Sequence, residues 1–159
     1  MTPSTGDLDA YVRRETAISI AINAALSLAF FLAIFGLDRP IPPWGVGGWV
    51  FDFMPQGFMI ALMSVLVPGI IAGRKLRSGR LVATPSSSLL PRHLVARAIL
   101  LAITSALAGS ALVATFVWIG GVQMLTPLAA LLFKVGYGAG LAAIITPPSL
   151  RTALSAPRP

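Results

Sequence analysis

The chain has 159 residues, of which 56% are hydrophobic and only 11% are charged, and its formal net charge is +7 at pH 7. A soluble domain carries about 25% charged residues, so this chain has too little polar surface for a water-soluble enzyme or a disordered protein. It contains no cysteine, which excludes structural disulfides, thiolate zinc sites and iron–sulfur clusters within the chain.

Four apolar stretches are each long enough to cross a bilayer, whose hydrocarbon core takes about 20 helical residues. They cover residues 15–36, 52–72, 94–119 and 127–146. We therefore predict an all-α integral membrane protein, a four-helix bundle surrounded by lipid. The first stretch follows Arg13-Arg14, as in a signal peptide, but it is longer than a signal-peptide core and lacks a small-residue cleavage site. We expect it to be retained as a span.

Turn and cap residues mark the ends of the last two spans. The chain carries no charge between Arg97 and Lys134, and that interval is too long for one helix across a membrane. A turn is therefore expected at Gly120-Gly121. Thr126-Pro127 predicts an N-cap followed by the first residue of the fourth helix, and Pro147-Pro148 predicts the end of that helix.

The basic residues indicate the orientation of the protein. They gather before the first span, in the segment between the second and third spans, and in the C-terminal tail, whereas the opposite side has only Arg39. The positive-inside rule then predicts an inner-membrane protein with both termini cytoplasmic. This explains the net charge without a nucleic-acid partner. The expected segments are an N-terminal segment 1–14, a hairpin 15–72, a basic linker 73–93, a hairpin 94–146 and a tail 147–159.

Two features are expected at the membrane surfaces. Trp44, Trp49 and Trp118 fall at the outer boundary, where an aromatic belt is predicted. The linker should be a loop or a short interfacial helix, and its cations could bind anionic lipid headgroups or only fix the topology. These cations are Arg74, Lys75, Arg77 and Arg80.

The two hairpins are candidates for a tandem duplication. A shift of 79 residues pairs Arg13-Arg14 with Arg92-His93, and it pairs Pro68 with Pro147. Both hairpins would then face the same way across the membrane, as parallel repeats do in some transporters.

Lys134 is the most informative residue, because an ionisable side chain within a span is costly and points to function. Counted from the start of its helix, it lies about 10 Å below the outer boundary, so its long stem could also lift the ammonium to the surface. Alternatively, it pairs with Asp52, at the outer end of the second span, with Gln56 one turn deeper on the same face. This cluster could bind an anion, neutralise a substrate or lock two helices together.

The first span carries a second polar set on one face. Glu15, Ser19, Asn23 and Ser27 recur every four residues. Asn23 and Ser27 lie deep enough to line a polar pathway, although hydrogen bonds to a neighbouring helix are the commoner role of such residues. Pro68 frees a backbone carbonyl near Ser64 and could kink the second helix.

Small residues predict close helix contacts in the second half of the chain. They are Ala102, Ala106 and Ser110 in the third span, and the Gly136–Gly140 pair in the fourth.

Two functions remain open. No catalytic motif is present, and the single histidine, His93, cannot form a haem or zinc site alone, so we expect neither enzymatic activity nor a cofactor. The first candidate is a permease or channel-like transporter of a small solute, acting as a homo-oligomer and using Lys134, Asp52, Gln56, Asn23 and Ser27. The alternative is a non-catalytic accessory or scaffolding subunit that binds other membrane proteins.

Overall fold

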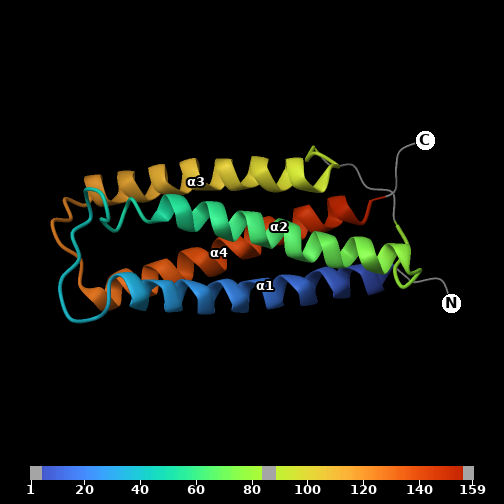
Figure 1. Cartoon of the computed structure of the whole chain (residues 1–159), viewed down its shortest axis with the longest axis horizontal. Coiled ribbons are helices and arrows are strands. Elements are labelled where there is room, and N and C mark those ends of the chain that lie inside the picture. The colour runs from blue at the N-terminus through green and yellow to red at the C-terminus, as the bar shows by residue number, and fades with distance from the viewer. Residues whose placement is uncertain (1–4, 84–88, 156–159) are drawn as a thin grey trace.

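The computed structural model describes residues 5–83 and 89–155, and within them it contains four α-helices and no strand (Figure 1). The helices are α1 (Thr5–Ile34), α2 (Phe53–Arg77), α3 (Leu94–Ile119) and α4 (Pro127–Ala153). All four are long and apolar enough to cross a membrane. The predicted all-α membrane four-helix bundle is confirmed.

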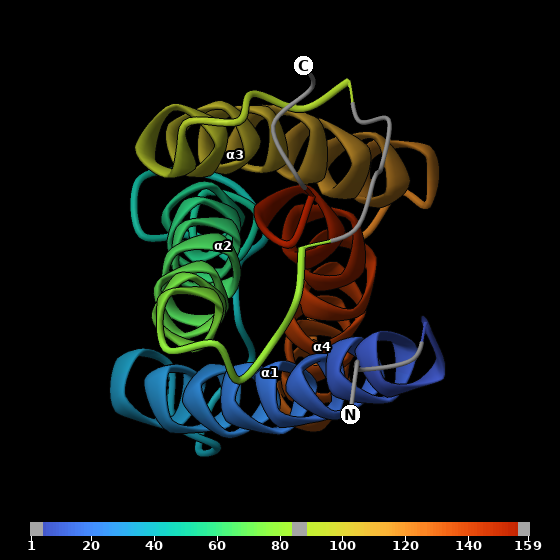
Figure 2. The same cartoon turned by 90° about the vertical axis from the view of Figure 1, so that its right-hand side faces the viewer.

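The helices form three layers. α3 and α1 lie on opposite outer sides, with α2 and α4 between them (Figure 2). α1 packs mainly along α4, α3 packs mainly along α2, and α2 and α4 meet in the centre. The two helices of each hairpin touch one another little. The hairpins are therefore continuous in sequence but do not pack as separate units.

This packing is compatible with a duplicated chain. Exchanging α1 with α3 and α2 with α4 leaves the set of helix pairs in contact unchanged. The shift of 79 residues pairs Pro68 with Pro147. Pro68 lies inside α2 and Pro147 lies inside α4, the two central helices. The duplication itself stays a prediction.

The two ends of the bundle differ in character. The N-terminus, the C-terminus and the α2–α3 connection lie at one end, which we call the basic end, and the other two connections lie at the tryptophan end (Figure 1). At the tryptophan end the two connections are joined by backbone hydrogen bonds of 2.9 Å in each direction between Ile41 and Leu125. α3 ends there at Gly120, followed by Gly121 with a φ of +60°, so the predicted turn is confirmed.

Each end has its own apolar core. At the tryptophan end the core is aromatic, with Trp49 and Phe53 at its centre. Small side chains of α2 and α3, among them Ala61 and Ala102, form the core between the ends. At the basic end the first turns of α1 pack against the last turns of α4 through Leu8, Tyr11, Val12, Leu150 and Leu154.

The predicted end of the fourth helix is wrong. α4 continues through Pro147-Pro148 to Ala153, although the prolines cannot bond to the carbonyls of Ala143 and Ile144 four residues earlier. The last turns of α4 are instead held by burial, because Leu150 and Leu154 are 1% and 2% exposed against the start of α1. α2 likewise continues past the predicted start of the linker to Arg77. Residues 84–88 of the linker lie outside the described residues.

Two of the three tryptophans predicted for the aromatic belt are free to face lipid or water, and the third is not. Trp44 and Trp118 are exposed, but Trp49 is buried among aromatic rings. Its ring centroid lies 4.7 Å from that of Phe53 and 5.2 Å from that of Phe133. The reason is the backbone of the α1–α2 connection, which folds back on itself: the Trp49 amide donates to the Pro42 carbonyl at 3.1 Å.

Candidate functional site

Buried polar side chains line the interface shared by α1, α2 and α4. On α1 they recur every four residues from Glu15 to Ser27, so they lie on one face and follow the helix for about 18 Å. Partners from α2 and α4 meet them in three groups, one near each end and one between. We call this set the polar column; it consists of Glu15, Ser19, Asn23, Ser27, Asp52, Gln56, Ser64, Lys75, Lys134 and Thr146.

The outer group, nearest the tryptophan end, contains a buried ion pair. Asp52 is the N-cap residue of α2 and makes no side-chain cap bond; its carboxylate instead pairs with the Lys134 ammonium. Lys134 is 2% exposed, and its Nζ lies 5.1 Å from the Phe53 ring centroid and 5.3 Å from that of Phe35. The predicted pair is present, and the lysine is enclosed by protein instead of reaching the surface.

Gln56 joins the outer group to all three helices. Its Nε2 donates to Ser27 Oγ on α1 at 3.0 Å and to the Lys134 carbonyl on α4 at 3.2 Å. Its Oε1 is buried and has no hydrogen-bond partner among the described residues. Ser27 therefore belongs to the outer group, together with Asp52 and Lys134.

Asn23 lies in a separate, middle group made of neutral side chains. Its Nδ2 donates to Ser64 Oγ on α2 at 3.2 Å and to the Ser19 carbonyl at 2.8 Å. Ser19 Oγ donates to Ser64 Oγ at 3.2 Å, and Thr146 Oγ1 on α4 donates to Ser19 Oγ at 3.1 Å. The sequence prediction placed Asn23 in one site with Lys134, but the structure gives it a different set of partners.

The third group lies toward the basic end. Glu15 is buried, and its Oε1 is 3.7 Å from Lys75 Nζ, on the last turns of α2. The same ammonium lies 4.2 Å from the Tyr11 ring centroid. The column therefore has an ion pair near each end and hydroxyl and amide groups between them.

Arg97 is a further buried charge, and it was not among the candidate site residues predicted from the sequence. It is 1% exposed on α3, and its Nε donates to Ser149 Oγ on α4 at 3.1 Å. Its Nη1 donates to the carbonyls of Pro91 and Arg92 at 3.0 and 3.3 Å. Its position in the sequence could have indicated this burial, because Arg97 lies within the predicted third span and not before it.

Within the chain, the predicted small-residue contacts are present on α3 but not at Gly136 and Gly140. Ala102 and Ala106 are buried, and Ser110 is half-buried and donates to the Ala106 carbonyl at 2.7 Å. At Gly136 and Gly140 an added Cβ would meet nothing within 4 Å, so these two residues do not form a helix contact within the chain.

Other glycines make the close contacts. An added Cβ at Gly57 would lie 3.0 Å from the Ser105 carbonyl on α3, and one at Gly138 would lie 3.4 Å from the Asn23 carbonyl on α1. Because glycine has no Cβ, the helices can approach at these points, one on each side of the central pair.

The predicted headgroup cations have divergent surroundings. Arg74, Arg77 and Arg80 are exposed at the basic end, whereas Lys75 is turned toward Glu15. Within residues 5–83 and 89–155, no three His, Asp or Glu side chains gather where they could hold a metal ion.

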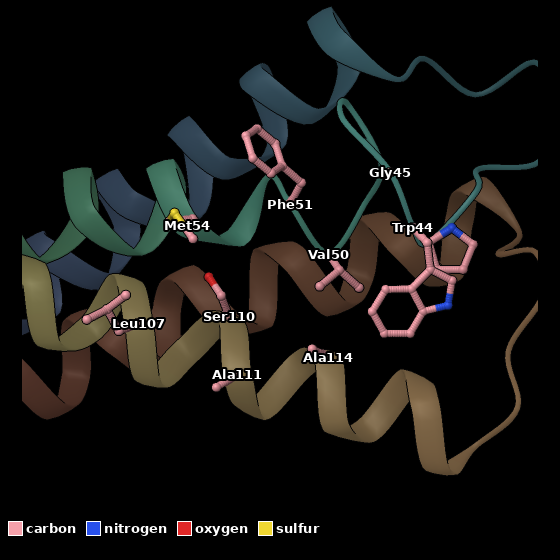
Figure 3. Close-up of a pocket in the computed structure, with 10 residues that line it drawn as sticks. Trp44, Gly45, Val50, Phe51, Met54, Leu107, Ser110, Ala111 and Ala114 are labelled. Atoms are coloured by element: carbon pink, nitrogen blue, oxygen red, sulfur yellow. The ribbon is translucent and has the colours of Figure 1, made fainter.

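An apolar groove lies apart from the column, between the start of α2 and α3. Figure 3 shows Phe51, Met54 and Leu107 along it, with Trp44 at the tryptophan end. Its volume is about 430 Å³, and Ser110 is the one hydroxyl in its lining.

The chain matches no protein-family model, and no curated protein and no solved structure matches it.

Proposed function

We propose that this protein is a small multi-pass inner-membrane transporter that moves a small polar solute along the polar column. The supporting observation is that the buried polar side chains of three helices share one interface and follow it from near one end of the bundle to near the other. Polar and ionisable side chains are expensive at membrane depth and typically mark solute or proton pathways.

The column is closely packed, which favours a transporter with moving helices over a permanently open pore. Prolines provide places for such motion. Pro68 leaves the Ser64 carbonyl without its helical partner, and Pro147 directly follows Thr146. Ser64 and Thr146 both belong to the middle group, so bends in α2 and α4 at these prolines would open the column at its centre.

Charge supports one orientation. The basic end holds the exposed arginines of α2 and the following loop, so the positive-inside rule places it in the cytoplasm. The pair formed by Lys134 and Asp52 then faces the outside of the cell.

We also propose that the protein acts as a homo-oligomer. Gly136 is exposed and has open space beside it, so α4 keeps a small-residue face for a helix of another copy. In the alternative role as an accessory subunit, Ala102 and Ala106 do not offer a docking face, because α3 already buries both within the chain. A foreign partner recovered at fixed stoichiometry in mild detergent would favour that alternative.

Flux into proteoliposomes tests the transport proposal. Stopped-flow swelling measures entry of a panel of small neutral and charged solutes into vesicles that contain the full chain. At least one solute should enter faster than into protein-free vesicles, and Gln56→Leu should abolish the difference by removing the bonds to Ser27 and Lys134.

Thr104→Val provides the matched control, because Thr104 is exposed on α3 and donates only to the Leu100 carbonyl of its own helix. This variant should keep the wild-type flux. No accelerated entry with any solute, or equal flux through Gln56→Leu, would contradict the proposal.

A further inference from the structure

The outer group has spare hydrogen-bond acceptors, and its donors outside the Gln56 amide are the Lys134 ammonium and the single hydroxyl of Ser27, whose oxygen already accepts from Gln56. Both N–H groups of the Gln56 amide are used, by Ser27 Oγ and by the Lys134 carbonyl. The Gln56 Oε1 is buried and accepts nothing from the described residues. A carboxylate has about four lone-pair sites, and the structure shows one oxygen of Asp52 paired with Lys134.

The surrounding surfaces also favour positive charge. The faces of Phe35 and Phe53 lie within cation–π range of the Lys134 ammonium. Apart from the Lys134 ammonium and the Ser27 hydroxyl, an anion in this place would meet a carboxylate, an amide oxygen and the negative faces of two rings. A small cation with N–H donors would meet the same groups as favourable partners.

We propose that the outer group is a binding site for a small ammonium-type cation, and that the Lys134 ammonium is its resident occupant, which the incoming cation displaces. As a statement about the transported solute this rests on the proposed function, whereas binding itself does not. The sequence left open whether the cluster binds an anion, neutralises a substrate or locks two helices together; the proposal assigns it a cation as its ligand.

The ion pair explains why the two cations compete. One buried carboxylate cannot compensate two positive charges, because each desolvated ion needs its own partner. The side chain of Asp52 is 21% exposed and that of Lys134 is 3% exposed, so a solute from the tryptophan end reaches the carboxylate first. The displaced ammonium can move toward that end on its four-carbon stem.

Chemical rescue tests the site in detergent micelles without any flux measurement. Lys134→Ala leaves the Asp52 carboxylate unpaired and should lower the Tm. Methylammonium chloride should restore the Tm by several degrees through mass action, while sodium chloride at equal ionic strength should not. Lys134→Gln repeats the test with a polar side chain if the alanine variant does not fold. The double variant Asp52→Asn with Lys134→Ala should lose the rescue.

Wild-type protein provides the decisive comparison. Calorimetric titration with methylammonium should show saturable binding about tenfold weaker than for Lys134→Ala, because the resident lysine reduces the fraction of open sites. Lys75→Ala is the matched control: it removes the cation of the other ion pair, which is 31% exposed, and leaves the outer group intact. Its Tm should therefore respond to methylammonium no more than the wild-type Tm does.

Three results would overturn the proposal: no saturable binding to the wild type, rescue that persists without Asp52, or a larger response to sodium acetate than to methylammonium. The two proposals fail separately. Methylammonium binding without flux would contradict the transport proposal and leave the cation site intact. Flux of neutral or anionic solutes without methylammonium binding would contradict the cation site and leave the transport proposal intact.

Discussion

The Asp52–Lys134 pair illustrates how a single contact can constrain a membrane protein more than it stabilises it. Two buried charges gain little in total when they pair, because both have lost their hydration, but removing one of them strands the other. The pair joins the N-cap residue of α2 to the eighth residue of α4, so it fixes the register of the two central helices at the tryptophan end.

A double-mutant cycle measures this coupling. We expect Asp52→Asn to lower the free energy of unfolding by about 3–5 kcal/mol, because it leaves the Lys134 ammonium buried without a counterion. Asp52→Asn combined with Lys134→Met should cost much less than the single change. Equilibrium unfolding in micelles gives both values, and a double variant that costs the sum of the two single changes would show that the side chains are not coupled.

The hydrogen bonds of Arg97 depend on the shape of its side chain as well as on its charge. Its planar guanidinium reaches Ser149 and two loop carbonyls simultaneously, which the single ammonium of lysine cannot reproduce. We expect Arg97→Lys to lower the free energy of unfolding by about 1–3 kcal/mol through lost charge-assisted hydrogen bonds.

Thermal unfolding in micelles checks this, with Arg151→Lys as the control. Arg151 also bonds through its guanidinium, to Asp9 at 3.4 Å, but both side chains are more than half exposed. Exposed pairs contribute little, so the control should unfold like the wild type. Equal effects of the two changes would argue against a special role for the buried guanidinium.

At the scale of the helices, glycine determines how closely α2 and α3 approach. An alanine at Gly57 would place its Cβ 3.0 Å from the Ser105 carbonyl, and backbone cannot move aside as a side chain can. We therefore expect Gly57→Ala to separate the two helices and to lower the Tm. Gly73→Ala, later in α2, has nothing within 4 Å of the new Cβ and should raise stability by up to about 1 kcal/mol through helix propensity. Similar changes in Tm for both variants would contradict the close-contact interpretation.

The ends of a helix were predictable from the sequence only where the helix is as long as its continuous apolar stretch. The residues 94–119 were predicted with the bounds that α3 has, because a continuous apolar stretch is visible in sequence. The early start of α1 and the continuation of α4 past Pro147-Pro148 depend on each other, through the core at the basic end. Leu8, Tyr11 and Val12 do have helical spacing, but nothing local shows that Leu150 and Leu154 will cover them.

Of the polar column, the sequence predicted the charged residues that lie within apolar stretches. Lys134 and Asp52 are unusual within apolar stretches, and the long lysine side chain can reach the outer end of the second span, so their pairing was one of two alternatives that the sequence offered. Ser64 and Thr146 gave no such signal, because hydroxyl side chains are common in membrane helices and often bond to their own backbone. Thr104 and Thr115 do so here, each donating at 2.8 Å to the carbonyl four residues earlier. Only the packing of three helices distinguishes the two kinds of hydroxyl.

For the molecule as a whole, the exchange of partners between hairpins has a mechanical consequence. Because α1 packs on α4 and α3 packs on α2, the bundle consists of two helix pairs that meet along α2 and α4. The polar column lies beside that central contact, on the α1 side. A relative rotation of the two pairs would therefore alter the column without breaking either pair, which is the kind of motion that parallel repeats permit.

The orientation of the whole molecule can be tested directly because the chain has no cysteine. Val46 is 96% exposed in the connection at the tryptophan end, and Arg80 is exposed at the basic end. A membrane-impermeant maleimide applied to intact spheroplasts should label Val46→Cys, whereas Arg80→Cys should react only after permeabilisation, since basic segments stay in the cytoplasm. The unmodified chain controls for background labelling. The opposite pattern would place the Asp52–Lys134 pair on the cytoplasmic side, and the proposed cation would then have to enter from the cytoplasm.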